Sequence, residues 1–366
     1  MFILYVSGTY MPASGGAEIS MYTLLQCLAQ RGHRISVFTS RFVPATPLYG
    51  SDVGIDVHYV ATENLQSALR EFCLRNAVEL IVSQNLWADV ALLFAREAGI
   101  PSVYFARAAH GRLDISKGSK YEPTFVIANS NHVASFVRKR WGWEAPVVRP
   151  IVRLKDYQAT EGSRSYITMI NPIRTHKGGD MFYKIARALE EREFLAVQGW
   201  GHLRSGDAWN ITLLQLLASG LGFAKVWVPQ DVDLTGLKNV KLWKSVSDMK
   251  RVYGETRLLL VPSTNIEASP RVVIEAMANG IPVIGSAKGG LPEVLSSTGI
   301  LVHHYENPAA WIEAIVRLDD PATYFAVSSS SRRYVESLDY SSEVSRCASL
   351  FRQIAQDFKS HKAYGS

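Results

Sequence analysis

The sequence predicts an α/β fold built from two consecutive Rossmann-like domains, each a doubly wound parallel sheet. Short apolar runs alternate with segments of helical periodicity, and this alternation restarts after a polar linker. Glycine-containing turns follow the first strand of both halves. A chain of 366 residues is long enough for two domains with separate cores.

Composition indicates an ordinary soluble protein, with 47% hydrophobic and 20% charged residues. No apolar run reaches the roughly 18 residues that a transmembrane helix needs. The stretch Met1–Val6 lacks a basic n-region and predicts a buried strand rather than a signal peptide. Cys27, Cys73 and Cys347 are widely spaced and form no CxxC pair, which favours a reducing, cytoplasmic compartment.

A formal net charge of +6 suits phosphate ligands, an anionic membrane surface or nucleic acid. The positive charge is mostly dispersed, which disfavours nucleic acid. One cluster contains Arg138, Lys139, Arg140, Trp141 and Trp143. It is interpreted either as the solvated end of a helix or as a peripheral membrane contact, because cations beside Trp suit a headgroup interface.

The first half predicts six strands joined by helices, taken in chain order. The predicted strands are Ile3–Val6, Arg34–Thr39, Val57–Ala61, Leu80–Ser83, Ser102–Ala106 and Phe125–Ala128. The predicted helices are Ala17–Arg31, Asn64–Asn76, Ala88–Ala98 and His132–Arg140. Strands that alternate with helices are typical of a parallel sheet with crossover helices.

The second half repeats the pattern after a polar linker near residues 150–164. The predicted strands are Tyr166–Ile170, Phe194–Val197, Val240–Trp243, Leu258–Val261, Val283–Ser286 and Ile300–His303. The predicted helices are Asp180–Glu190, Ser247–Gly254, Pro270–Asn279, Pro308–Leu318, Ala322–Glu336 and Ser341–Phe358. The expected domains are residues 1–155 and 156–340. Residues 341–366 form a C-terminal helix that could fold back onto the N-terminal domain.

Two turns have the composition of phosphate sites. Gly15 and Gly16 open a helix after the first strand, where free N–H groups and a partial positive charge suit an anion. Residues 171–179 follow the first strand of the second half and carry Lys177 with Gly178 before a helix. Each is also explained as a plain turn. The absence of GxGxxG lowers the case for a nicotinamide enzyme.

The most specific motif is a pair of glutamates, Glu267 and Glu275, with seven residues between them. Ser269 is a good N-cap, Pro270 suits the first helical turn and Gly280 ends the helix. Glu267 then precedes the helix and Glu275 lies within it. This spacing suits one carboxylate on a sugar hydroxyl and one on a ribose, with the helix N-terminus facing phosphate between them.

These motifs together resemble glycosyltransferase family 4, the group 1 glycosyl transferases, which are retaining enzymes of the GT-B fold. The resemblance runs through almost the whole chain. It rests on the segments Gly15–Glu18, Arg31–His33, Lys177–Gly178, Glu267–Glu275 and Gly289–Glu293. It implies two Rossmann-like domains that face each other across a cleft, an N-terminal domain for the acceptor and a C-terminal domain for the nucleotide sugar.

The resemblance also implies roles for individual residues. Glu275 would bond the nucleotide ribose, and Glu267 would hold a hydroxyl of the donor sugar. Lys177 would neutralise the diphosphate, and Gly16 would offer its backbone N–H to it. The base would lie against the end of the strand at Lys241–Val246.

Three departures from the family pattern change the expected donor site. Asn171, with the proline after it, replaces a Gly-Arg pair, and Arg174 is expected to compensate. Ser269 and Pro270 replace Phe-Gly, and because Pro270 has no N–H, Arg271 is expected to supply positive charge.

The third departure concerns the end of the strand Ser102–Ala106. A histidine often stands there in the family, whereas this chain has Arg107. We interpret Arg107 as a clamp for phosphate or sugar, against a structural loop arginine. His110, three residues on, is a second catalytic candidate.

The expected reaction is transfer of a hexose, with UDP-glucose as the expected donor and GDP-mannose next. The acceptor is a glycan or a lipid-linked sugar. Cations and helix N-termini would stabilise the departing diphosphate. Double displacement through Glu267 is an alternative mechanism. A nucleotide-sugar 2-epimerase, a non-catalytic nucleotide-sugar-binding protein and a dehydrogenase are alternative functions.

No metal and no cofactor besides the nucleotide sugar are expected. Asp231 and Asp233 spell the DxD motif of metal-dependent glycosyltransferases, but they lie in the weakly assigned segment Leu203–Lys238. We interpret this match as coincidence.

Overall fold

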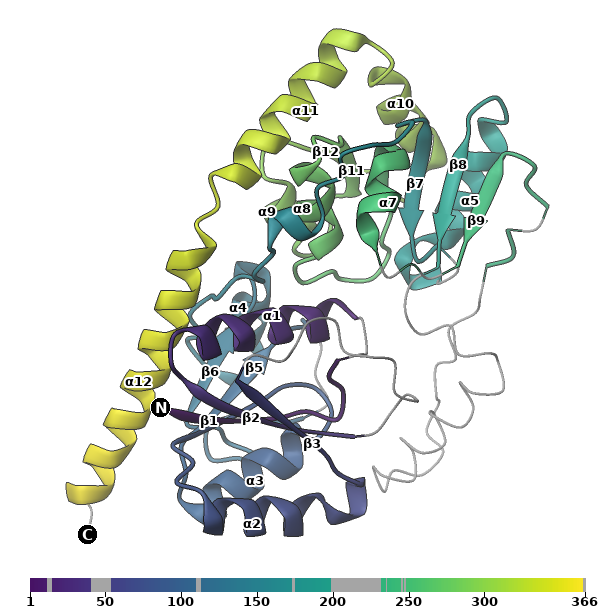
Figure 1. Cartoon of the computed structure of the whole chain (residues 1–366). Helices are drawn as coiled ribbons and strands as arrows, with labels where there is room; N and C mark the ends of the chain where they lie inside the picture. Colours follow the sequence, from purple (N-terminus) through teal and green to yellow (C-terminus); the bar gives the residue numbers. More distant parts are fainter. Residues whose placement is uncertain are drawn as a thin grey trace. The chain divides into compact units, whose positions relative to one another are not determined.

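The computed structural model contains two parallel sheets, each of six strands in the part of the chain that it describes, and divides the chain into two units (Figure 1). It describes residues 1–11, 15–40, 54–109, 113–172, 175–198, 232–234, 236–244, 246 and 248–364. The first unit is made of residues 1–152, 267–271 and 339–366, and the second of residues 153–266 and 272–338. This division groups residues 267–271 with the N-terminal half, whereas we expected them in the C-terminal domain.

The first unit has the strand order β3-β2-β1-β4-β5-β6, with all neighbours parallel. Its strands are β1 (Phe2–Val6), β2 (Arg34–Thr39), β3 (Ile55–Tyr59), β4 (Leu80–Ser83), β5 (Ser102–Ala106) and β6 (Phe125–Ala128). Its helices are α1 (Gly16–Gln30), α2 (Leu65–Arg75), α3 (Ala88–Ala98), α4 (Asn131–Trp141) and α12 (Tyr340–Tyr364), with the 3-10 helix η1 (Thr62–Asn64).

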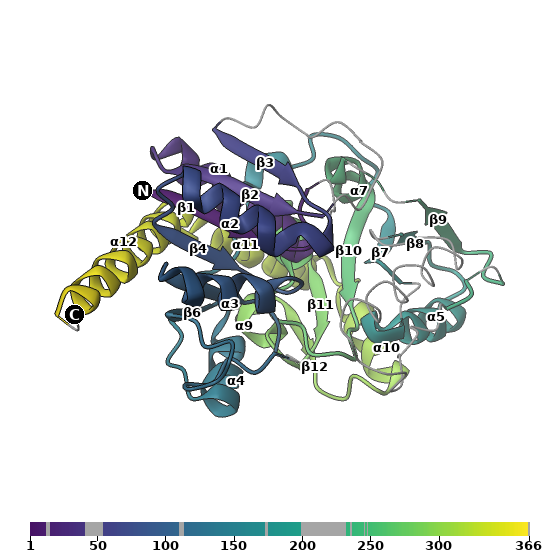
Figure 2. The ribbon, with the colours of Figure 1, turned by 90° about the horizontal axis from the view of Figure 1, so that it is seen from below.

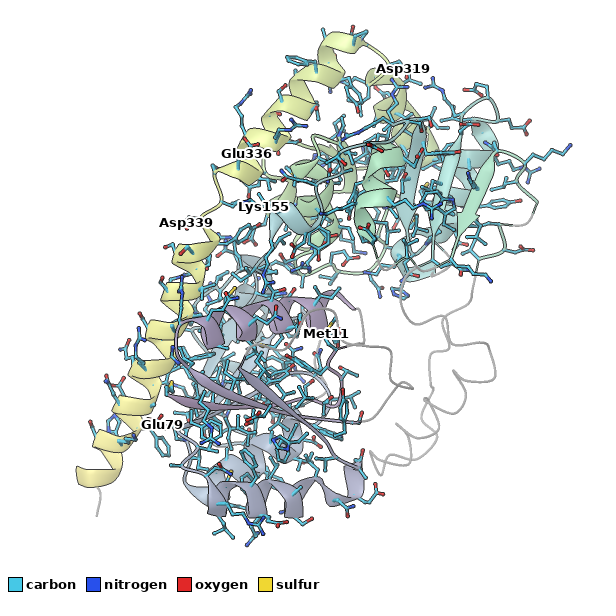
Figure 3. The ribbon with its side chains drawn as sticks, viewed as in Figure 1. Met11, Glu79, Lys155, Asp319, Glu336 and Asp339 are labelled. Carbon is cyan, nitrogen blue, oxygen red and sulfur yellow. The ribbon has the colours of Figure 1, made fainter. Side chains whose placement is uncertain are left out.

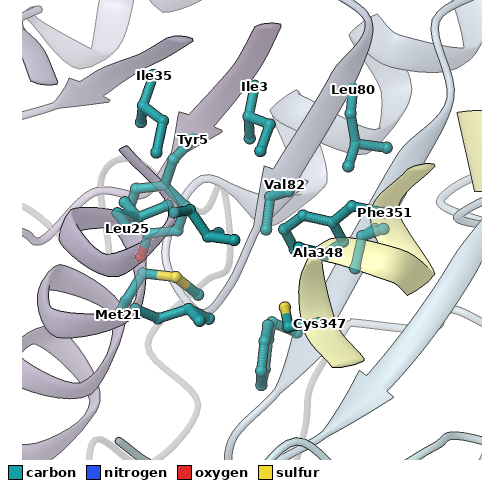
Figure 4. Packing of buried hydrophobic residues seen from close by; sticks show 14 of the residues in the cluster. Ile3, Tyr5, Met21, Leu25, Ile35, Leu80, Val82, Cys347, Ala348 and Phe351 are labelled. Atoms are coloured by element: carbon teal, nitrogen blue, oxygen red, sulfur yellow. The ribbon is translucent and has the colours of Figure 1, made fainter. Parts of the chain in front are cut away.

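Two layers of helices cover this first sheet. One face packs against α1 and α12, where Tyr5 and Val82 of the sheet meet Leu25 and Phe351 (Figure 4). The other face packs against α2, α3 and α4, and Figure 2 is seen from the side of α2 and α3. The alternation of strand side chains therefore builds two apolar layers in one unit.

Helix α12 is part of the core of the first unit. Cys347 and Phe351 are at most 1% exposed within the core cluster, beside strands β1 and β4. Arg31 donates hydrogen bonds to Ser345 Oγ and to the Ser341 carbonyl, at 2.9 Å each. The C-terminal helix thus completes the face that α1 leaves uncovered.

The second unit has the order β12-β11-β10-β7-β8-β9. Its strands are β7 (Tyr166–Ile170), β8 (Phe194–Val197), β9 (Val240–Trp243), β10 (Thr256–Val261), β11 (Val283–Ser286) and β12 (Ile300–Val302). Its helices are α5 (Gly179–Ala188), α7 (Met249–Glu255), α8 (Arg271–Ala278), α9 (Leu291–Leu295), α10 (Pro308–Arg317) and α11 (Pro321–Glu336), with the 3-10 helices η2 (Leu154–Asp156) and η3 (Thr175–Lys177). Phe182 and Trp311, both fully buried, join α5 and α10 to one face of this sheet.

Both sheets repeat one strand order. Counted within each half, the order is 3-2-1-4-5-6, so the direction of winding reverses between the first and fourth strands. These reversal points lie between β1 and β4 and between β7 and β10. Ligands of open α/β sheets bind beside the carboxyl ends of the strands at such points.

The predicted strands all appear in the structure in the predicted order, and two local differences stand out. Strand β3 begins at Ile55 rather than Val57. The reason is that its parallel pairing with β2 already starts at Ile55, which lies opposite Ile35. The prediction misses α9, because a five-residue helix is too short for helical periodicity to appear.

An ion pair in the second unit joins the loop between α5 and β8 to the loop between α10 and α11. The Nη1 and Nη2 atoms of Arg192 donate to the two carboxylate oxygens of Asp319, each at 2.7 Å (Asp319 is labelled in Figure 3). The Arg192 guanidinium holds the pKa of this carboxyl below its ordinary value, with Arg257 adding to the effect. Both side chains are partly exposed, so the pair contributes on the order of 1 kcal/mol.

We therefore predict that Asp319→Asn lowers the free energy of unfolding of the second unit by about 1 kcal/mol at neutral pH. A carboxyl whose pKa is lower in the folded state stabilises above its unfolded pKa of about 3.9 and loses this contribution as pH falls through the folded pKa. Denaturant curves of variant and wild type should therefore converge as the pH falls below the folded pKa. Exposed Asp156, which has no ion pair among the described residues, provides the control Asp156→Asn. A difference that persists at low pH would contradict the electrostatic origin.

Candidate active site

The loop after β7 turns sharply at the reversal point of the second sheet. Asn171 adopts φ +63° and donates its N–H to the Val197 carbonyl at 2.7 Å. Gly178 adopts φ +89° and caps α5, and a Cβ at this position would overlap the Pro262 carbonyl. Only glycine fits such a conformation so close to backbone. The turn thereby presents the N-terminus of α5, with its free N–H groups, at the carboxyl end of the sheet.

The same loop is joined to the loop that follows β10. The His176 carbonyl accepts hydrogen bonds from the N–H groups of Thr264 and Asn265, at 3.2 and 3.1 Å. Lys177 is the next residue, at the end of η3 and just before the helix. The backbone of the loop that carries Lys177 is therefore hydrogen-bonded to Val197 of β8 on one side and to the loop after β10 on the other.

Glu275 lies in α8 and is 4% exposed. The hydroxyl of Tyr253, which is fully buried in α7, donates to Glu275 Oε2 at 2.7 Å. A carboxylate that is this deeply buried needs such partners. Tyr253 therefore orients the carboxylate, a role that the sequence analysis missed because Tyr253 lies 22 positions from Glu275.

The segment Glu267–Arg271, which ends at the first residue of α8, is grouped with the first unit. Arg271 is 6% exposed, and its Nη1 donates to the Ile151 carbonyl at 2.6 Å. Ala268 packs against the cluster that contains Trp141. Glu267 and Ser269 lie in the same short segment. Lys177 and Glu275 are in the second unit, so the convergence of Glu267 with them on one pocket stays a prediction.

A row of polar side chains ends the central strands of the first sheet. Ser7, Gln84 and Arg107 are 0%, 0% and 8% exposed. Each follows a core residue of the face under α1 and α12 by two positions, namely Tyr5, Val82 and Phe105. Arg107 Nε donates to Gln84 Oε1 at 2.6 Å, and Ser7 Oγ donates to the Gln84 carbonyl at 3.4 Å.

Gln84 is the residue of this row that the sequence analysis overlooked. A signal was available: strand alternation places Leu80, Val82 and Gln84 on one face, and the last of them is polar. The chain after it is also unusual, since Asn85 and Trp87 adopt φ values of +51° and +73°. Non-glycine residues in this region carry strain that is concentrated at functional sites.

The guanidinium of Arg107 lies in a buried environment with mixed charge. Burial lowers its pKa to about 10, while Tyr5 and Glu18 act in the opposite direction and Arg271 adds to the lowering. Its carbon Cζ lies 4.3 Å from the centre of the Phe105 ring. The group is therefore still cationic at neutral pH, and it is held over an aromatic face.

The glycine turn after β1 leads into α1, which begins at Gly16. Glu18 in the first helical turn accepts a hydrogen bond from Thr9 Oγ1 at 2.9 Å. A Cβ on Gly15 would overlap the Glu18 carboxylate. A side chain at residue 15 would therefore displace the Glu18 carboxylate from this position.

Other predicted site residues have more limited structural support. His110 and Arg174 lie outside the described residues, as does Asp231. Val246 lies three residues after β9 and packs against the cluster of Leu195, Val197 and Val252. The predicted role of each of these residues stays a prediction.

The basic cluster on α4 is only partly as expected. Trp141 is 5% exposed in the core, and the Trp143 indole N–H donates to the Ile115 carbonyl at 2.6 Å. Arg138, Lys139 and Arg140 are exposed. Trp141 is therefore part of the core, and a membrane contact at this face would involve the three cations and the partly exposed ring of Trp143.

Two kinds of feature are missing from the part of the chain that the structure describes. No group of three His, Cys, Asp or Glu side chains there is arranged to hold a metal ion. No helix among those residues is both long and apolar enough to cross a bilayer.

Solved structures define the class of fold. A sucrose-phosphate synthase from Thermosynechococcus elongatus aligns over 97% of this chain and 99% of its own, with a TM-score of 0.72 and 19% identity. HepE from Anabaena, in complex with UDP, aligns over 96% and 100%, with a TM-score of 0.71 and 16% identity. At this identity the likeness concerns the fold alone, which is GT-B, as expected.

Family models add the type of protein. Residues 14–152 match the model described as "Glycosyltransferase Family 4", and residues 174–320 match "Glycosyl transferases group 1". The two halves of this GT-B fold therefore match glycosyltransferase models, family 4 in the N-terminal half and group 1 in the C-terminal half.

Curated relatives match over part of their length. A D-inositol 3-phosphate glycosyltransferase from Corynebacterium glutamicum is 32% identical over 108 residues, which are 29% of this chain and 25% of that protein. One of the subunits of human phosphatidylinositol N-acetylglucosaminyltransferase is 23% identical over 329 residues, 82% of this chain and 65% of that protein. The chain thus spans between a quarter and two thirds of these two relatives.

The loop geometry at Gly178 leads to a stability prediction. Gly178→Ala should lower the free energy of unfolding of the second unit by about 2 kcal/mol or more, because the new methyl group combines positive φ with overlap on the Pro262 carbonyl. Urea denaturation followed by circular dichroism measures this. Gly236→Ala is the matched control, since a Cβ there meets no atom of the described residues within 4 Å. Equal losses in both variants would refute the packing argument.

Proposed function

We propose that the protein is a retaining glycosyltransferase that moves a hexose from a nucleotide diphosphate sugar to a glycan or a lipid-linked acceptor. The expected donor is UDP-glucose, with GDP-mannose as the next candidate. The proposed setting is polysaccharide or glycoconjugate biosynthesis in the cytoplasm. Peripheral contact with the membrane through Arg138, Lys139 and Arg140 is part of the proposal.

The observation that carries this proposal is the arrangement at the reversal point of the second sheet. Gly178 packs on the Pro262 carbonyl and presents the N-terminus of α5 beside Lys177. In the same unit, the buried carboxylate of Glu275 is held by Tyr253. A helix N-terminus with a lysine suits a diphosphate, and an oriented carboxylate suits the two hydroxyls of a ribose.

These groups suggest how the reaction proceeds. Lys177 and the N–H groups of α5 stabilise the negative charge that develops on the departing diphosphate. Glu275 fixes the nucleoside, so that binding energy remote from the reacting carbon positions the sugar. Attack by the acceptor hydroxyl on the leaving-group face, with a diphosphate oxygen taking its proton, retains the anomeric configuration.

Similar proteins support the choice of donor. The Anabaena structures of HepE are described in complex with UDP, with UDP and glucose, and with UDP-glucose. Two of the relatives named above act, by their names, on inositol-containing acceptors. Because inositol carries several hydroxyl groups, these relatives support a polyhydroxylated acceptor for this chain.

Turnover of UDP-glucose tests the proposal. The purified chain is incubated with UDP-glucose, and UDP and sugar products are quantified with and without methyl α-glucoside and myo-inositol as soluble acceptors. Faster UDP release with an acceptor supports transfer. An altered sugar on an intact diphosphate would instead identify an epimerase. Binding of UDP without any turnover would identify a binding protein.

Two variants test the residues of the second unit. Glu275→Ala should raise the dissociation constant for UDP by roughly tenfold or more, since the lost hydrogen bonds involve a charged group. Tyr253→Phe should raise it about two- to tenfold, because the carboxylate loses its orienting partner. Calorimetric titration with UDP measures both.

Tyr324→Phe is the matched control for Tyr253→Phe, because the Tyr324 hydroxyl donates to the Arg257 carbonyl at 2.8 Å in the same unit. It should leave UDP affinity unchanged. If Tyr253→Phe behaves like this control, Tyr253 does not orient Glu275.

Metal independence is a separate prediction. Because Lys177 and the α5 N-terminus supply the positive charge, UDP-glucose turnover should be equal in excess EDTA and in Mg²⁺. Lys177→Ala should lower kcat strongly in both conditions. Loss of turnover in EDTA that Mg²⁺ restores would overturn this prediction.

A further inference from the structure

The polar row of the first unit contains a buried amide without a partner. Gln84 is fully buried, and its Oε1 accepts from Arg107. Its Nε2 group, which has two N–H donors, finds no hydrogen-bond partner among the described residues. A buried donor left in this state costs about 1–3 kcal/mol. Native proteins rarely carry such a cost without a ligand or a role for the group.

The side chain of Arg107 also has hydrogen-bond donors without a partner among the described residues. Among the described residues its guanidinium makes one hydrogen bond, from Nε to Gln84. Its Nη groups therefore keep their donors for another molecule. A buried cation next to a neutral amide is poorly compensated, and an anion would compensate it. The planar fork of a guanidinium suits the paired oxygens of a phosphate.

Charged groups around Arg107 include both signs. Arg271 is a second buried cation in the same unit, and Glu18 is a buried carboxylate that bonds Thr9. The buried Tyr5 hydroxyl and Cys347 thiol also interact electrostatically with the guanidinium, and burial raises the pKa of that thiol to about 12, so it is neutral. Two cations and one carboxylate leave a net positive charge for an anionic ligand.

We propose that Gln84 and Arg107 bind a phosphate group carried by the acceptor, at the carboxyl end of β4 and β5. The inference rests on the proposed transfer reaction, and it narrows the acceptor to a phosphorylated sugar or polyol. Arg107 pairs with the phosphate, and the Gln84 amide donates to an oxygen of the same acceptor. The donor diphosphate has its own loop at Lys177 in the second unit, so the cation of the first unit is available for a different phosphate.

Direct binding of inorganic phosphate tests this site. Phosphate is titrated calorimetrically into the full chain saturated with UDP, so that the donor site is already occupied. We expect phosphate to bind under this condition. Arg107→Gln should raise its dissociation constant at least about tenfold, and Gln84→Leu about two- to tenfold. Arg107→Lys keeps the charge but loses the fork, and an intermediate effect is expected.

Controls separate this site from the donor site. Lys177→Ala should leave phosphate affinity unchanged in the first unit, and Arg70→Gln replaces an exposed arginine of the same unit as a matched control. Circular dichroism checks that each variant folds. If Arg107→Gln does not fold, Arg107→Lys replaces it in the titration. The proposal would be overturned if phosphate does not bind or if UDP displaces it. It would also be overturned if phosphate affinity falls in Lys177→Ala or is unchanged in Arg107→Gln. Failure of UDP itself to bind would instead contradict the proposed transfer reaction.

Discussion

The reversal of winding in each parallel sheet is the constraint on which the candidate site depends. At β1 and β4, and again at β7 and β10, the connections leave in opposite directions, so the carboxyl ends of the two strands are not closed over by a crossover. In the second unit this is where Gly178 meets the Pro262 carbonyl. In the first unit it is where Ser7 bonds the Gln84 carbonyl. The same topology thus creates one ligand position in each unit.

Much of the fold follows from local pattern. Strands with apolar residues on both faces are short and unambiguous when glycine, proline or polar turns bound them, and all twelve predicted strands appear in the predicted order. Boundaries were less predictable, because the ladder with a neighbour decides where a strand begins, as it does at Ile55. Helix α9 shows the opposite limit: five residues carry too little periodicity to identify a helix.

The candidate site was predictable where a residue type has a backbone reason. Gly178 was singled out because glycine before a helix suits an anion, and its φ and packing require glycine. Gln84 was not singled out, because its significance depends on an unpartnered amide 23 positions from Arg107. Tyr253 and Glu275 present the same difficulty. Contacts of this kind arise from the register of parallel strands and from helix packing, which a single sequence does not display.

The place of α12 has a consequence for how the protein is made. Cys347 and Phe351 fill the core between β1, β4 and α1, although nearly the whole chain separates them from β1. During translation the N-terminal half leaves the ribosome first, but one face of its sheet lacks this cover until α12 follows. This apolar face of the nascent domain therefore stays exposed until α12 has been synthesised. A truncated product would be a natural substrate for chaperones.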